Sequence, residues 1–157
     1  MNVQQIFDLG LKVGIKADPR GAKGVEAHLG RIKKAYKDIK PKDKKYFDKD
    51  KLVNPYLDSR IHVDNGKTVK RVMAGIDIDE GEVLLASQLG ERKKKIDLVI
   101  AHHPVGKSLA DLHDVMEMLS EIFAEAGVPV HVAEKIMEER VKEVGRGVHP
   151  INHYQLI

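Results

Sequence analysis

Two adjacent histidines, His102 and His103, are the residues of this chain best suited to chemistry. They follow the nearly continuous apolar run 96–101, which is typical of a parallel strand covered on both faces, and they precede Pro104. Neighbouring side chains on a strand point to opposite faces, but a chain that turns at a proline can direct both imidazoles into one cavity. Imidazole nitrogen is a ligand for zinc, manganese and iron, so the pair predicts a divalent-metal site. The alternative is a pair of surface loop histidines without a ligand.

Acidic side chains are expected at the same edge of the sheet. An apolar strand is also predicted earlier in the chain, at 71–77. Open α/β sheets bind ligands where their parallel strands end. Asp77 and Asp79 close this strand, and Glu134 follows a third strand predicted at 128–132. We select Asp77 as the carboxylate that accepts the other ring N–H of a ligating imidazole and so fixes its orientation. No motif identifies a catalytic base or a small-molecule substrate.

Residues 101–108 also fit a relaxed phosphate-binding pattern, in which alanine replaces the first glycine and Lys107 and Ser108 end the motif. Such a loop offers successive backbone N–H groups to a phosphate, and Pro104 has none. The two imidazoles would also crowd the cradle. A nucleotide-binding loop remains the alternative to a metal site.

The elements that would position these residues alternate along the second half of the chain. Asp79 and Glu82 form a capping-box pattern for a helix after the first strand, a clear amphipathic helix is predicted at 109–126, and a last helix ends at Gly145 or Gly147. The order predicts a three-layer α/β fold, with a largely parallel sheet and crossover helices. Helices at 2–14 and 23–39 precede it. We interpret 1–157 as a single α/β domain with a helical lead-in at 1–53.

Composition narrows the setting of the protein. The 157 residues suit one domain, and no stretch approaches the roughly 18 apolar residues of a membrane span. With no cysteine and no leader-like N-terminus, a cytoplasmic protein with nitrogen and oxygen metal ligands is expected. The net charge of +3 is mild and the lysine-rich run 31–51 is diluted by aspartates, so specific nucleic-acid binding is not expected. We interpret His131, His149 and His153 as structural.

Residues 69–157 resemble the NIF-three-like family, also labelled GTP cyclohydrolase I type 2 homologues. The resemblance is sharpest in the strand 72–77 and in the run 97–104, which contains His-His-Pro. It implies a dinuclear metal centre with the paired histidines, His102 and His103, among the ligands. It also implies a ring-like homo-oligomer and a hydrolase activity. Residues 13–60 resemble the longer branch of the family.

The chain departs from the family pattern in its remaining ligands. The family supplies them from a later His-Thr…Asp segment and from a C-terminal histidine and glutamate, and no such motif occurs up to Ile157. We interpret the chain either as the N-terminal part of a longer family fold or as a shortened relative, and expect fewer than two ions per site. A metal-dependent hydrolase and a non-catalytic interaction or scaffold protein with a vestigial metal site both remain open.

Overall fold

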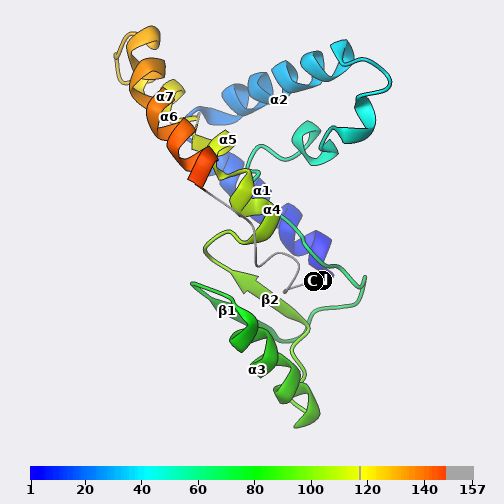
Figure 1. The fold of residues 1–157 in the computed structure, drawn as a ribbon. Coiled ribbons are helices and arrows are strands. Elements are labelled where there is room, and N and C mark those ends of the chain that lie inside the picture. The colour runs from blue at the N-terminus through cyan, green and yellow to red at the C-terminus, as the bar shows by residue number, and fades with distance from the viewer. Residues whose placement is uncertain (117, 148–157) are drawn as a thin grey trace.

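The computed structural model describes residues 1–116 and 118–147. The elements in chain order are α1 (Val3–Ala17), α2 (Gly21–Asp38), η1 (Lys44–Tyr46), η2 (Lys49–Leu52), β1 (Val72–Gly75), α3 (Glu80–Glu91), β2 (Leu98–Ala101), α4 (Gly106–Ala110), α5 (Leu112–Met116), α6 (Met118–Glu125) and α7 (Val130–Gly147). Figure 1 shows the two strands and α3 as a unit at one end of the molecule, with α2, α6 and α7 at the other end. The fold is therefore a mixture of helix and strand with a small parallel sheet.

The two N-terminal helices begin and end at recognisable signals. Asn2 and Gln5 cap the start of α1 reciprocally, because the backbone N–H of each donates to the side chain of the other, at 3.0 and 2.9 Å. The helix ends at Ala17, since the ring of Pro19 holds the preceding Asp18 in an extended conformation. The predicted helices at 2–14 and 23–39 are confirmed to within a few residues.

The strands β1 and β2 pair in parallel, as predicted, and α3 connects them. The register places Val72 beside Leu98 and Gly75 beside Ala101. The carboxylate of Asp97 accepts the backbone N–H groups of Lys70 and Arg71 at 3.1 and 3.0 Å, and these bonds hold its pKa below the ordinary value. Asp79 and Glu82 form the predicted capping box at the start of α3, where Glu82 Oε2 accepts the Asp79 N–H at 2.9 Å.

The prediction of a third strand at 128–132 is wrong. Helix α7 begins at Val130, and the carbonyl of Pro129 accepts the N–H groups of Val132 and Ala133 at 2.8 and 3.0 Å. The β-branched residues suggested a strand, but Ala133 and Met137 are spaced for one face of a helix, and both are buried. In the described parts of the chain the sheet has two strands, so the three-layer arrangement is not seen there.

The long helix predicted at 109–126 is also divided. Asp111 leaves helical geometry between α4 and α5, with φ −95° and ψ 7°. The predicted end of this helix at 126 is confirmed to within one residue: Gly127 has φ +92°, its N–H donates to the carbonyl of Ala124 at 3.0 Å, and the N–H of Val128 donates to that of Phe123 at 3.0 Å. This pairing is a Schellman motif, which glycine favours because it has no Cβ.

The helical part contains most of the buried apolar side chains. Helices α5 and α6 pack on α7, and α2 packs on α1 and η2. Their buried residues include Val25, Ala133 and Met137. The βαβ unit instead leaves Ile76, Leu84 and Ile100 exposed by 63%, 58% and 40%. Among the described helices, none has the length and apolar character needed to cross a membrane.

Candidate metal site

The two histidines continue the parallel pairing of β1 and β2 beyond the strands. The N–H of His102 donates to the carbonyl of Gly75 at 2.9 Å, and the N–H of His103 donates to that of Ile76 at 2.8 Å. Because Gly75 lies beside Ala101, an equal advance of two residues along each strand brings Asp77 beside His103. The register of the sheet thus places this carboxylate and this imidazole together.

The side chains of Asp77 and His103 are in direct contact. Asp77 Oδ1 lies 2.8 Å from His103 Nδ1. An ionised carboxylate can only accept a hydrogen bond, so Nδ1 carries the proton in this pair. In the neutral imidazole Nε2 then keeps its lone pair, and it is the atom able to bind a cation. The carboxylate therefore selects which nitrogen of His103 is the candidate ligand.

His102 lies beside this pair on an open surface. Its ring centroid is 5.2 Å from that of His103, and the two ring planes are tilted by 36°. The side chains of His103 and Asp77 are 58% and 73% exposed, so water and solutes reach them. Across residues 1–116 and 118–147, no group of three or more histidine and acidic side chains is placed to hold a metal ion. These residues thus place two imidazoles and one carboxylate beside one another.

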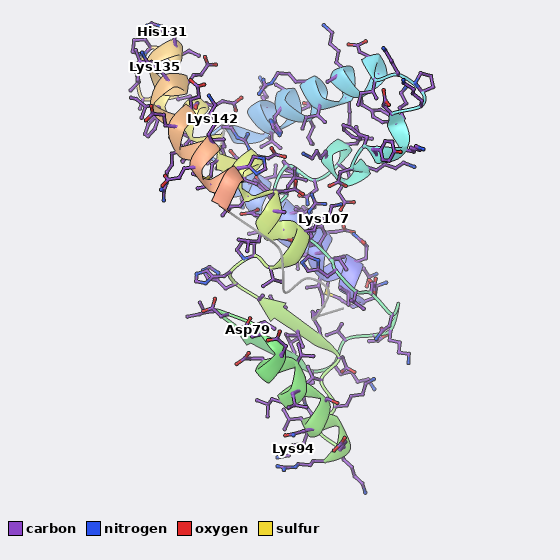
Figure 2. All side chains as sticks on the ribbon, in the orientation of Figure 1. Asp79, Lys94, Lys107, His131, Lys135 and Lys142 are labelled. Atoms are coloured by element: carbon purple, nitrogen blue, oxygen red, sulfur yellow. The ribbon has the colours of Figure 1, made fainter. Side chains whose placement is uncertain are left out.

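The other acidic residues expected at this edge are used differently. Glu134 is in α7, where the sequence predicted a strand before it, and Asp79 takes part in the capping box of α3. Figure 2 shows His131 at the far end of α7 from Asp79 and the βαβ unit. His149 and His153 lie outside the described residues.

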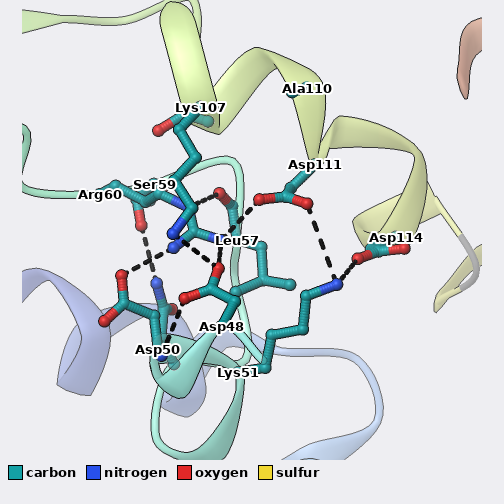
Figure 3. Close-up of polar contacts among 12 residues, drawn as sticks. Asp48, Asp50, Lys51, Leu57, Ser59, Arg60, Lys107, Ala110, Asp111 and Asp114 are labelled. Carbon is teal, nitrogen blue, oxygen red and sulfur yellow. Dashed lines mark hydrogen bonds and ion pairs between the residues drawn. The ribbon is translucent and has the colours of Figure 1, made fainter. Parts of the chain in front are cut away.

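Lys107, the lysine of the phosphate-loop pattern, is engaged by an acid. Its Nζ lies 3.0 Å from Asp48 Oδ2, and Figure 3 shows the side chain directed toward that carboxylate. The helix that would receive the phosphate, α4, has five residues, and Gly106 begins it with φ +54°. These contacts give the nucleotide-binding alternative no support beyond its sequence pattern.

The histidine pair is separate from a cleft in the helical part. That cleft, about 910 Å³ in volume, lies between α2 and helices α5, α6 and α7, and Arg31, Glu121 and Met137 are among its lining residues. His102 and His103 do not line it. The histidine pair is therefore considered as a site because of its contact with Asp77, and not because it lines a cleft.

One arginine with a buried side chain was not selected from the sequence. Arg60 is buried and contacts Asp48, Asp50 and Asp111, and Asp48 also contacts Lys107; we call these five residues the Arg60 cluster (Figure 3). Its partners lie 10 to 51 residues away along the chain. Local periodicity carries no signal for contacts of this length, and Asp48 and Asp50 were interpreted only as diluting a lysine-rich surface.

Comparison with known proteins agrees with the family resemblance of the sequence. No protein-family model and no curated protein matches the chain. Among solved structures it is similar to a NIF3 superfamily protein from Sphaerobacter thermophilus, with a TM-score of 0.55 and 32% identity. The similarity covers 64% of this chain and 36% of that protein, so the chain spans about a third of the length of the structure it matches. The resemblance predicted from the sequence is confirmed as a similarity of structure: this chain is similar to part of a NIF3 superfamily protein.

Proposed function

We propose that this chain contributes His102 and His103 to a divalent-metal site of a NIF3-like, metal-dependent hydrolase. The observation that carries the proposal is the contact of 2.8 Å between Asp77 and His103. A carboxylate bonded to the distal nitrogen is the usual outer partner of a metal-binding imidazole, because it fixes both the tautomer and the plane of the ring. A surface loop histidine without a ligand does not require a carboxylate to orient its ring.

The donor set fits a borderline cation. Two imidazole nitrogens with a nearby carboxylate suit zinc, manganese or iron better than magnesium or calcium, which prefer oxygen ligands. In this proposal His103 binds through Nε2, Asp77 orients the ring, and His102 supplies the second nitrogen. A bound cation would polarise the substrate and lower the pKa of its water, which is the chemistry that such hydrolases need.

Two imidazoles alone would hold an ion weakly, and we propose that further protein covers the site and the sheet. The two-stranded sheet would extend into a three-layer arrangement in the complete fold. The exposed apolar side chains Ile76, Leu84 and Ile100 would be buried there or in a homo-oligomer. The same cover would enclose the histidine pair, which faces open solvent here.

One observation favours a second candidate, the non-catalytic interaction protein with a vestigial metal site. Within the described residues no third metal ligand joins the histidines. The two candidates differ in turnover, since the vestigial site would bind metal without hydrolysing any substrate. Metal-loaded protein assayed against nucleotides and cyclic amides would separate them.

Isothermal titration with zinc and with manganese tests the proposal. We expect the wild type to bind an ion and His102→Ala and His103→Ala to lose most of that affinity. His131→Ala is the matched control, because it removes an exposed imidazole from the far end of α7. Loss of affinity in the control alone, or equal affinity in all four proteins, would place the metal elsewhere.

A further inference from the structure

Arg60 is buried despite its charge. Its side chain is 2% exposed, and all three of its nitrogens donate. Nη2 donates to Asp48 and to Asp111 at 2.7 Å each, Nη1 to Asp50 at 2.7 Å, and Nε to the carbonyl of Leu57 at 2.9 Å (Figure 3). A planar guanidinium suits this geometry because its donors point outward in a fixed fork.

These contacts join two segments that are distant in sequence. Asp48, Asp50 and Leu57 belong to the stretch that leads up to Arg60, whereas Asp111 directly follows α4. Two further contacts run the same way: Lys107 Nζ lies 3.0 Å from Asp48 Oδ2, and Ser108 Oγ lies 3.4 Å from His62 Nε2. These contacts thus come from Lys107 and Ser108 of α4 and from Asp111 directly after it, within about one helical turn of each other. One face of α4 therefore rests on residues 48–62.

Helix α4 depends on such contacts for its orientation. It has five residues, and so short a helix has little stability of its own. It begins at Gly106, three residues after His103, so its position fixes the outgoing end of the loop 102–105. The incoming end is fixed by the bonds of His102 and His103 to β1. The loop is thus anchored to the sheet on one side and to the Arg60 cluster on the other.

We infer that Arg60 is a positioning residue for the histidine pair: it fixes α4, and through α4 it limits the motion of the loop that carries His102 and His103. This inference rests on the proposed metal site for its functional meaning. Arg60 acts without touching the metal. A lysine at this position keeps the charge but offers a single nitrogen, so it cannot bridge Asp48, Asp50 and Asp111 at once.

Arg60→Lys is the test variant, and Arg20→Lys is its matched control. Arg20 is also buried, with a side chain 3% exposed, and it pairs with Asp18 and Glu121, neither of which is in α4. Two properties are measured below the unfolding temperature of every protein. One is zinc affinity by titration, and the other is hydrogen exchange of the backbone amides of 102–108 in the metal-free protein.

We expect Arg60→Lys to weaken zinc binding by about tenfold, the low end of the range for loss of an outer partner, and to speed amide exchange over 102–108. Arg20→Lys should lower the unfolding temperature yet leave both properties at the wild-type values. Equal effects of the two variants would overturn the inference, because they would reflect general destabilisation, and so would unchanged exchange in Arg60→Lys.

Two further outcomes are also decisive. If wild-type protein takes up no zinc, the proposed function fails, and the exchange measurement still decides whether Arg60 orders the loop. If Arg60→Lys does not fold, Asp111→Asn takes its place, because it keeps the bonds of Arg60 to Asp48 and Asp50 and weakens the link to α4. Faster exchange over 102–108 in that variant supports the inference, and wild-type exchange overturns it.

Discussion

Asp18 should give the protein a stability that acid removes, and Asp18→Asn tests this. The carboxylate is 1% exposed and lies at the junction of α1 and α2. Oδ1 accepts the backbone N–H and the Nε of Arg20 at 2.9 and 3.0 Å, and Oδ2 accepts Arg20 Nη2 at 2.9 Å and the Tyr56 hydroxyl at 2.8 Å. The bonds from Arg20 lower the pKa of Asp18 from 3.8 to about 2, against the opposing effect of burial. Burial and the Asp18 carboxylate raise the pKa of Tyr56 to about 12.

The sign and size of the effect follow from these values. Because the pKa of Asp18 is lower in the folded state, its contribution is complete above about pH 4 and is lost as the pH falls through about 2. The difference of roughly 1.8 pKa units, at about 1.36 kcal/mol per unit, corresponds to about 2 kcal/mol. The asparagine side chain of the Asp18→Asn variant does not take up a proton in this pH range, so the variant lacks this pH dependence. It should be less stable than wild type near neutral pH, since Arg20 is left without its main partner.

The assay is urea unfolding at a series of pH values from 7 to 2, followed by circular dichroism. The free-energy gap between wild type and Asp18→Asn should narrow by about 2 kcal/mol over the acid part of the range. Asp38→Asn removes the same charge from an exposed position of α2 and serves as the control. A gap that stays constant down to pH 2 would refute the reasoning.

Three further outcomes follow from the geometry. Asp77→Ala should weaken zinc binding by about tenfold, because the ring of His103 loses its orienting partner; unchanged affinity in a titration would remove Asp77 from the site. Lys107→Ala removes a partly exposed ion pair, so the free energy of unfolding should change by less than about 1 kcal/mol, and a thermal shift with ATP that disappears in this variant would revive the nucleotide-binding alternative. Gly75→Ala places a Cβ 2.9 Å from Ile78 Cδ1 and 3.1 Å from the carbonyl oxygen of Asp77. We expect it to cost about 1–3 kcal/mol, and full wild-type stability in urea would contradict the close packing.

The elements that were predicted from the sequence share strong local signals. The start of α3 follows from a capping box, and the end of α6 follows from Gly127. The approach of Asp77 to His103 also followed from a general rule, because parallel strands end at one edge of a sheet. The helix ends depend on few residues close together in sequence, whereas the contact of Asp77 with His103 depends on where two paired strands end.

The errors arose where tertiary contacts outweigh local preference. The segment 128–132 has the composition of a strand, but Ala133 and Met137 bury a helical face against α5 and α6, and this decides its structure. The break at Asp111 accompanies the bond of its carboxylate to Arg60, a contact across 51 residues. A periodic sequence pattern does not indicate which distant residues pair. The Arg60 cluster is therefore visible only in the folded structure.

The most direct test of the metal site is NMR of the histidine ring nitrogens during titration with zinc. Such spectra separate Nδ1 from Nε2 in each ring. The proposal predicts that the Nε2 signal of His103 shifts on binding while its Nδ1 stays protonated and bonded to Asp77, and that the ring of His102 shifts at the same zinc concentration. Binding of His103 through Nδ1, or saturation with zinc while both rings keep their metal-free signals, would contradict it.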